Sequence, residues 1–208
     1  MTVRTAHGIW VVPPQRAVWI PAKVPHSTEM SGIVAMRTLW FKPGTIKSLA
    51  KRCHVINVTP LLRELILQAC TLGKLNMRRA SDKHTIGLLL CQLKTAKNLP
   101  LQLPMPTDSR AIAAADLMIT RPAAYTDIRD LGKKVGASKR TLERLFENET
   151  GLSIGKWRQQ LRLLHVMRSI AAGEKVTGAA LDVGYNSPSA FIAMFKKTLG
   201  QTPTQYFS

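Results

Sequence analysis

Charged side chains at helical spacing are the feature of this sequence that points most directly to chemistry. At about 100° per residue, Arg140, Glu143, Arg144 and Glu147 share one side of a helix, and apolar side chains occupy the opposite side. Arginine can form two hydrogen bonds with guanine, and glutamate can accept one from cytosine. A polar stripe of this kind can enter a DNA major groove.

The same side chains also allow simpler interpretations. Arg140 and Arg144 could be ordinary solvated charges on a helix surface. Glu143 follows Lys139 by one turn and can form an ion pair with it instead of accepting a hydrogen bond from cytosine. For Glu143 the sequence leaves both alternatives open.

The segment around this stripe has the local signals of a helix-turn-helix. Thr126 is predicted to cap a helix that runs to Val135, and Gly136 supplies the sharp turn after it. Ser138 is then predicted to cap the next helix, which runs to Asn148. The charged stripe lies on this second, recognition helix.

The arrangement recurs further along the chain. A helix predicted over 176–183 ends at Gly184, and Ser187 followed by Pro188 begins another helix that runs to Leu199. The side chains predicted to point outward from this second recognition helix are Ser189, Ile192, Ala193 and Lys196.

A long helix predicted over 153–172 separates the two units. At 1.5 Å per residue it is about 28 Å long, close to the ~34 Å of one DNA turn, so the two recognition helices can enter successive major grooves. The second unit is expected to bind more weakly. Ile192 and Ala193 cannot form bidentate base contacts, and Gly178 weakens its helix by about 1 kcal/mol relative to alanine.

Segments 136–146, 149–151, 184–191, 195–197 and 200–206 resemble the paired helix-turn-helix signature of the AraC/XylS family of bacterial transcription regulators. The positions that the resemblance implies for base reading are Arg140, Glu143 and Arg144, and in the second unit Ser189, Ala190 and Ala193. The resemblance implies that Asn186 and Ser187 hold phosphates. The remaining DNA-binding positions that it implies are Ser138, Lys139, Thr141, Lys196 and Lys197.

The first half of the chain reads as β-rich. Short strands separated by proline and glycine are predicted over 9–12, 16–20, 26–30, 33–41 and 54–58. A helix that begins with Thr59 as its cap and Pro60 as its first residue is predicted to end near Gly73, and Ser81 is predicted to cap another through Leu93.

The predicted fold class is α+β with two domains. Residues 1–97 are expected to form a partial β-barrel with helices, and residues 108–208 an all-α domain that contains the two helix-turn-helix units. Pro100, Pro104 and Pro106 interrupt regular structure, so residues 98–107 are predicted to be a linker.

Residues 8–21 and 24–26 resemble the later strands of the cupin sensor domain in one branch of the same family. The predicted strands fall short of the roughly eight strands of a double-sheet barrel, so we expect an N-terminally truncated sensor and dimerisation domain. Because one histidine without partners at ligand spacing cannot hold a metal, no metal, cofactor or catalytic residue is predicted.

Three residues in this half, Trp10, Trp19 and His26, are implied as the remains of an effector pocket. The two tryptophans, together with Trp40, are twice as readily explained as core residues between sheet and helices, and His26 as an ordinary histidine of the sheet. An effector pocket in this chain is therefore expected to be incomplete.

Composition limits the function classes further. The chain of 208 residues has 30 Lys and Arg and 12 Asp and Glu, a formal net charge of +18, which favours a polyanionic partner. Residues 110–208 carry 15 basic and 8 acidic side chains, so +11 of this charge lies in residues 1–109. The sequence starts without the pattern of a signal peptide and has no apolar run of membrane-spanning length, so a cytoplasmic protein without membrane contact is expected.

We therefore predict a sequence-specific, non-enzymatic transcription regulator whose partner is promoter DNA. RNA polymerase, a small-molecule effector and a second copy of the chain, bound through helices over 61–93, are further partners that such a regulator can have. The alternatives are a metal-dependent cupin enzyme fused to a DNA-binding domain and a truncated regulator without function. A methyl-accepting DNA-repair protein is disfavoured because Cys53, Cys70 and Cys91 are isolated from one another.

Overall fold

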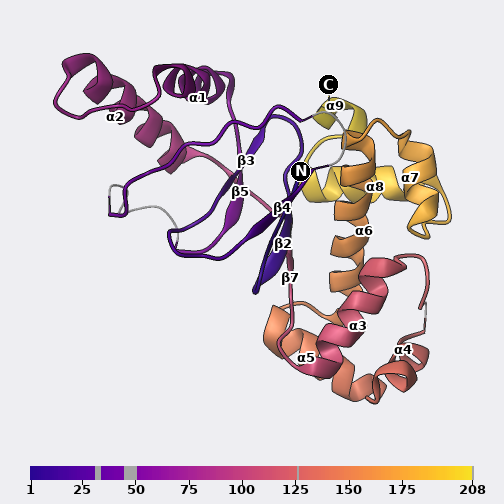
Figure 1. Ribbon diagram of the computed structural model, residues 1–208. Coiled ribbons are helices and arrows are strands. Elements are labelled where there is room, and N and C mark those ends of the chain that lie inside the picture. Colours follow the sequence, from indigo (N-terminus) through magenta and orange to yellow (C-terminus); the bar gives the residue numbers. More distant parts are fainter. Residues whose placement is uncertain (31–33, 45–50, 126, 208) are drawn as a thin grey trace.

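The computed structural model describes residues 1–30, 34–44, 51–125 and 127–207. Its strands are β1 (Thr2–Thr5), β2 (Gly8–Val11), β3 (Arg16–Trp19), β4 (Ser27–Glu29), β5 (His54–Asn57), β6 (Asn98–Leu99) and β7 (Gln102–Pro104). They form a four-stranded antiparallel sheet in the order β4-β1-β2-β7 and a three-stranded antiparallel sheet in the order β3-β5-β6 (Figure 1). Neither sheet closes into a barrel among these residues.

Strand β1 is absent from the strands predicted above. It forms a hairpin with β2 in which Thr5 is opposite Gly8 and Val3 is opposite Trp10, and both Val3 and Trp10 are buried. The segment has a single fully apolar residue, but threonine and valine are β-branched and fit a pleated strand well. Pairing with β2 therefore determines the strand structure of residues 2–5 more than the hydrophobicity of these residues does.

The strand predicted over 33–41 is wrong for residues 34–41, which form no strand; Ile33 lies outside the described residues. This segment is attached through side chains instead of a ladder of backbone hydrogen bonds: the rings of Phe41 and Trp19 lie 5.9 Å apart. Trp40 is 87% exposed, which contradicts its assignment to the core or to a cavity. Aromatic and β-branched composition suggested a strand here, but no described strand edge pairs with it.

The prolines suggested that residues 98–107 lack regular structure, but the structure shows that this prediction is wrong. These residues contain β6 and β7, one in each sheet. Both strands lie at the edge of their sheet, and Pro104 is the last residue of β7. A proline is compatible with an edge strand because its missing N–H faces away from the ladder.

Two helices complete the described part of the first half of the chain. Helix α1 (Pro60–Leu72) has Thr59 as its cap, whose hydroxyl accepts from the backbone N–H of Leu62 at 3.2 Å, as predicted. Helix α2 (Ala80–Thr95) begins before Ser81, so the prediction that Ser81 caps it is wrong. The Ser81 hydroxyl instead lies 3.4 Å from the carboxylate of Asp82, which accepts the backbone N–H of the preceding loop at Asn76.

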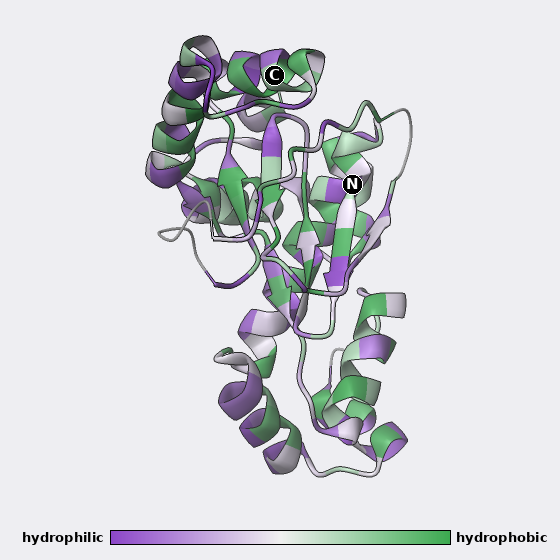
Figure 2. Cartoon of the chain, turned by 60° about the vertical axis from the view of Figure 1, so that its left-hand side comes forward, coloured by the Kyte–Doolittle hydropathy of each residue, from purple (hydrophilic) through white to green (hydrophobic). Residues whose placement is uncertain are grey.

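The second half contains the predicted six helices and a short terminal helix within residues 108–207. They are α3 (Ser109–Thr120), α4 (Ile128–Val135), α5 (Lys139–Thr150), α6 (Ile154–Ala171), α7 (Val176–Asp182), α8 (Pro188–Leu199) and α9 (Pro203–Phe207). Helix α6 runs between the group of α3, α4 and α5 at one end and the group of α7, α8 and α9 at the other (Figure 1). Hydrophobic and hydrophilic residues lie on different sides of these helices (Figure 2), which is the pattern of helices packed around a core.

The two halves share a continuous hydrophobic core, and α6 is the element that joins them. The indole of Trp157 on α6 donates to the carbonyl of Pro104 at 2.7 Å, and the side-chain amide of Gln160 donates to the carbonyl of Gln102 at 3.1 Å. Strand β7 is therefore docked along α6. The helical half is held against the four-stranded sheet by both apolar packing and hydrogen bonds.

Candidate DNA-binding surface

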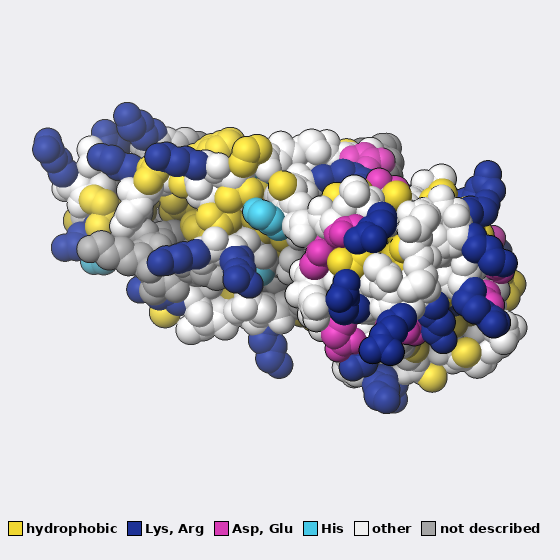
Figure 3. All heavy atoms as spheres, turned by 90° about the horizontal axis from the view of Figure 1, so that it is seen from below, with side chains coloured by type: hydrophobic (Ala, Val, Ile, Leu, Met, Phe, Trp, Pro, Cys, Tyr) yellow, Lys and Arg dark blue, Asp and Glu magenta, His cyan; other side chains and the backbone are white. Residues whose placement is uncertain are grey.

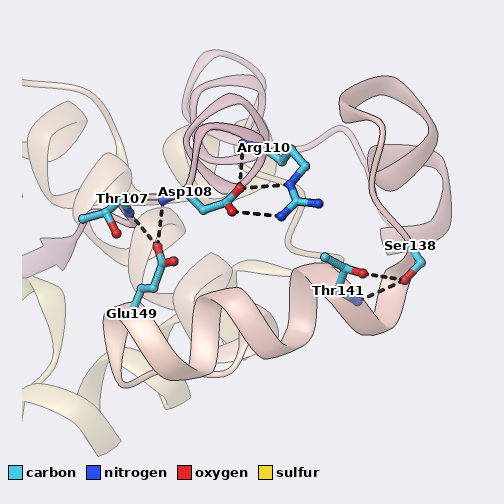
Figure 4. Close-up of polar contacts among 6 residues, drawn as sticks. All are labelled: Thr107, Asp108, Arg110, Ser138, Thr141 and Glu149. Atoms are coloured by element: carbon cyan, nitrogen blue, oxygen red, sulfur yellow. Dashed lines mark hydrogen bonds and ion pairs between the residues drawn. The ribbon is translucent and has the colours of Figure 1, made fainter.

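The first helix-turn-helix consists of α4, the turn at Gly136 and α5. Asp127 caps α4 by accepting from the backbone N–H of Arg129 at 2.8 Å; the predicted cap, Thr126, lies outside the described residues. Gly136 has the left-handed conformation (φ 65°) that glycine adopts without strain. Ser138 then caps α5 by accepting from the N–H of Thr141 at 3.1 Å, as predicted, and the two hydroxyls lie 2.9 Å apart (Figure 4).

Sequence reasoning missed the role of Gly132 in this unit. Its carbonyl accepts from the N–H of Ala137 at 3.0 Å, so the turn folds back against α4. A Cβ atom on Gly132 would overlap the carbonyl oxygen of Ala137. The available signal was a glycine inside a short helix, which usually has a packing reason.

Helix α5 separates its apolar and charged side chains as predicted. Leu142 and Phe146 are fully buried, whereas Arg140, Glu143 and Arg144 are exposed. Glu143 lies 3.8 Å from the ammonium group of Lys139, so the structure contains the intrahelical ion pair that was one of the two alternatives. Within the described ranges neither Arg140 nor Arg144 takes part in an ion pair. Two guanidinium groups on this surface are therefore not neutralised by a carboxylate.

The second helix-turn-helix repeats the geometry. The N–H of Tyr185 donates to the carbonyl of Ala180 at 3.2 Å, the counterpart of the Ala137–Gly132 hydrogen bond. Gly184 has a left-handed conformation (φ 83°), and Ser187 caps α8 by accepting from the N–H of Ala190 at 3.3 Å. The predicted turn and cap of this unit are therefore present.

Helix α8 buries Phe191 and Phe195 and exposes the opposite face. The exposed side chains of this face and of the preceding turn are Asn186, Ser189, Ala190, Ile192, Ala193, Lys196 and Lys197. Ser187 is half-buried at the cap. The outward face of α8 carries lysine only near the C-terminal end of the helix, so α8 offers fewer groups for base recognition than α5 does.

Helix α6 holds the two units at a defined separation. Its 18 residues correspond to about 27 Å at 1.5 Å per residue, close to the predicted length. Arg162 of this helix donates to the carbonyl of Pro122 at 3.2 Å, in the loop before the first unit, and to the carbonyl of Gly184 at 3.4 Å, in the turn of the second. Sequence reasoning missed this bridge, because the carbonyls that it joins are set by tertiary structure.

Charge is distributed unevenly between the two halves. Figure 3 shows Lys and Arg side chains over both halves of one face, whereas Asp and Glu gather over the helical half. Several of these carboxylates are already paired, as in Arg129–Asp127 at 2.8 Å and Lys133–Asp130 at 3.5 Å. The unpaired positive charge favours a polyanion such as DNA.

Comparison with known proteins identifies the family. Residues 131–208 match the family model described as a helix-turn-helix domain. The chain is 32% identical over 208 residues to the HTH-type transcriptional regulator NimR of Escherichia coli K12, covering 100% of this chain and 76% of NimR. The chain belongs to the AraC/XylS family. It is thus an AraC-type DNA-binding transcription regulator.

Two further matches cover shorter parts of this AraC/XylS-family chain. It is 29% identical over 129 residues to the HTH-type transcriptional regulator RipA of Corynebacterium glutamicum, covering 62% of this chain and 38% of RipA. A solved AraC-type regulator from Chromobacterium violaceum is 24% identical with a TM-score of 0.44, covering 47% of this chain and 88% of that one.

The residues implied for an effector pocket in this AraC/XylS-family chain lie in different surroundings. Trp10 is 2% exposed in the four-stranded sheet, and its indole N–H has no hydrogen-bond partner among the described residues. Trp19 lies in the three-stranded sheet against Phe41. His26 is exposed, with Nδ1 2.9 Å from the carbonyl of Val24. The pocket stays a prediction.

The described ranges of this AraC/XylS-family chain contain no sign of a metal site or of a membrane span. No three His, Cys, Asp or Glu side chains there gather as a metal site, and no helix there is long and apolar enough to cross a membrane. Burial raises the pKa of the Cys53 thiol, which is opposite to the activation that a methyl-accepting cysteine needs.

Proposed function

We propose that this regulator binds specific promoter sequences by placing α5 and α8 in two successive major grooves on one side of the duplex. The observation that carries the proposal is the pair of matching turns at opposite ends of α6, each followed by a capped helix with an exposed outer face. The length of α6, about 27 Å, suits grooves one turn apart.

Different residues of the DNA-binding surface are proposed to contact the bases and the sugar-phosphate backbone. Arg140 and Arg144 contact base edges, because their guanidinium groups are exposed and can form two hydrogen bonds each. Glu143 is paired with Lys139 in the free protein. It contributes to base reading only where its carboxylate leaves Lys139 and accepts a hydrogen bond from cytosine instead. The residues proposed for the backbone of the first half-site are Ser138, Lys139 and Thr141, and for the second Asn186, Ser187, Lys196 and Lys197.

The second recognition helix adds contacts of a different kind. Ser189, Ala190 and Ala193 are proposed to face bases of the second half-site. Alanine offers only apolar contact, for example with a thymine methyl group. The first half-site is therefore proposed to dominate sequence choice.

The first half of the chain is proposed to be a cupin-derived sensor domain that regulates DNA binding without catalysing a reaction. The resemblance of residues 8–21 to cupin strands supports this origin. A homodimer contact is proposed at α1, α2 and the loop between them. The exposed apolar side chains that support it are Leu61, Leu72, Met77 and Leu88. An effector near Trp10, Trp19 and His26, contact with RNA polymerase and a cytoplasmic location complete the proposal.

The decisive experiment is gel-shift binding of the purified chain to DNA upstream of its own and neighbouring genes, at several salt concentrations and with nonspecific competitor. We expect a competitor-resistant complex whose footprint covers two half-sites about one helical turn apart. Binding that competitor abolishes completely, with an affinity set by salt alone, would contradict sequence-specific recognition.

A further inference from the structure

An arginine of the β-rich half reaches the end of the DNA-binding half. Arg16 is the first residue of β3, and its Nε–H donates to the hydroxyl of Tyr206 on α9 at 3.0 Å. The centre of its guanidinium lies 4.4 Å from the centroid of the Tyr206 ring. Arg16 thus contacts this tyrosine through both a hydrogen bond and a cation–π interaction.

Tyr206 connects this contact to the second recognition helix. Its side chain is 8% exposed, and its ring packs edge-on against Phe195 of α8 at 5.5 Å. Phe195 contacts Phe191 at 5.7 Å, and Phe191 contacts Tyr185 at 5.4 Å. These four rings form an aromatic row along the buried side of α8.

An arginine lies at each end of the aromatic row. Arg16 contacts Tyr206 at one end, and Arg162 lies 6.0 Å from the Tyr185 ring at the other. Arg162 belongs to the helical half, and it also binds the turn of the second unit. Arg16 belongs to the sheet, so one end of the row depends on a residue outside the helix-turn-helix units.

The backbone around Arg16 holds its guanidinium in place. Gln15 has a left-handed conformation (φ 56°), unusual for a residue with a side chain, and its carbonyl accepts from Arg16 Nη1 at 2.9 Å. The same carbonyl lies 3.3 Å from the N–H of Val58, which follows β5. The guanidinium is therefore fixed at the point where the chain passes from one sheet to the other.

We infer that Arg16 is a positioning residue for the second recognition helix, acting through Tyr206 and the aromatic row. Helix α9 has five residues, too few to be stable without tertiary contacts. Its tyrosine is held between Arg16 on one side and Phe195 on the other. The β-rich half thereby contributes to how firmly α8 is held. Its contact with the first unit does not involve Arg16: the carbonyl of Pro104 accepts from Trp157, whose ring packs edge-on against Phe146 of α5 at 5.2 Å.

The first test is independent of DNA. Amide hydrogen exchange of the full chain is compared between wild type and Arg16→Ala. We expect exchange to become about threefold to tenfold faster in α8 and α9 while α5 stays unchanged, because loss of the contact lowers local stability at one end of the domain. Unchanged rates in α8, or an equal rise in α5 and α8, would overturn the inference.

Two variants separate the contact from its charge. Arg16→Lys keeps the positive charge and can still form a cation–π contact but loses the planar group and the Nε–H donor, so its effect should fall between wild type and Arg16→Ala. Arg78→Ala removes one exposed positive charge from the loop between α1 and α2, and it should leave exchange in α8 unchanged. If Arg78→Ala raises exchange in α8 as much as Arg16→Ala does, the loss of one positive charge is sufficient and the positioning role is wrong.

The second test rests on the proposed two-groove docking. The probes are the footprinted duplex and the same duplex with its second half-site scrambled. Arg16→Ala should weaken binding to the intact duplex about threefold to tenfold and leave the scrambled duplex unaffected. An equal loss on both would contradict the inference. If wild type gives no specific complex, the proposed docking fails, and hydrogen exchange alone decides the role of Arg16.

Discussion

The two recognition helices differ in the surface that they present and in the contacts that fix them. Helix α5 presents the guanidinium groups of Arg140 and Arg144. Polar contacts of Ser138 and Glu149 lie at its two ends (Figure 4), and Phe146 packs edge-on against Trp157 beneath it. Helix α8 presents small and apolar side chains over most of its outer face; it has a serine cap of the same kind, at Ser187, and the aromatic row lies beneath it. The side chains that can form bidentate base contacts are thus concentrated in one unit, while the aromatic row of the other unit reaches Arg16 of the sheet.

The turns of the two units differ in a related way. In the first unit Gly132 leaves no room for a side chain beside Ala137. At the corresponding position the second unit has Ala180, which is fully buried and makes the same backbone hydrogen bond. The first turn is therefore the tighter of the two, and it holds the helix that carries the arginines.

The largest expected effect comes from filling the tight turn. Gly132→Ala should lower the free energy of unfolding by about 1–3 kcal/mol and weaken DNA binding at the first half-site, because the new methyl group overlaps backbone that cannot rotate away. Thermal unfolding and footprinting measure both effects. A variant as stable as wild type would show that the two turns are equally tolerant.

A pair of substitutions tests where base recognition lies. Arg144→Ala should cost about 1–3 kcal/mol of binding free energy on the preferred site and relax the preference at one base pair. Ala193→Arg should change affinity for the second half-site if α8 lies in a groove. Competition with single-base variants of the footprinted duplex measures both. A uniform loss across all sequences for Arg144→Ala would instead identify a phosphate contact.

A smaller effect of opposite sign is expected in the second unit. Gly178 lies inside α7, and a Cβ atom there would meet no other atom within 4 Å. Gly178→Ala should therefore raise the free energy of unfolding by up to about 1 kcal/mol through helix propensity alone. Denaturant unfolding measures the gain. A loss of stability would show that the second unit, like the first, has no spare room.

The helical half could be predicted closely because its signals are local. Ser138 and Ser187 are caps, and Gly136 and Gly184 are turns, each recognisable within a few residues. The arginine stripe followed from helical spacing in the same way. These features depend on neighbours along the chain, which a sequence displays directly.

The sheet half was harder because strand pairing joins distant segments. β7 pairs with β2, and β6 pairs with β5, although the segment of β6 and β7 reads as a proline-rich linker. The contact of Arg16 with Tyr206, which joins the two ends of the chain, leaves no pattern in either segment. Such contacts are visible only once the tertiary structure is known.

The smallest expected effect concerns the polar contacts that fix α5. Glu149 accepts the backbone N–H groups of Thr107 at 2.6 Å and Asp108 at 3.0 Å (Figure 4). These hydrogen bonds hold the pKa of the Glu149 carboxyl below its usual value. A lowered pKa in the folded state stabilises the fold above the carboxyl's ordinary pKa, and this contribution is lost as pH falls through the lowered value.

Glu149→Gln should therefore lower the melting temperature slightly at pH 7, by roughly 1–3 °C, since an exposed carboxylate contributes well under 1 kcal/mol. The difference from wild type should disappear as the pH is lowered below the ordinary range of a glutamate. Asp108 cannot mimic this loss, because its hydrogen bond with Arg110 holds its pKa at about 2. Glu147→Gln is the control for charge on the same helix. A wild-type advantage that persists at low pH would mean that the carboxylate charge does not hold α5, and that both recognition helices are fixed mainly by packing.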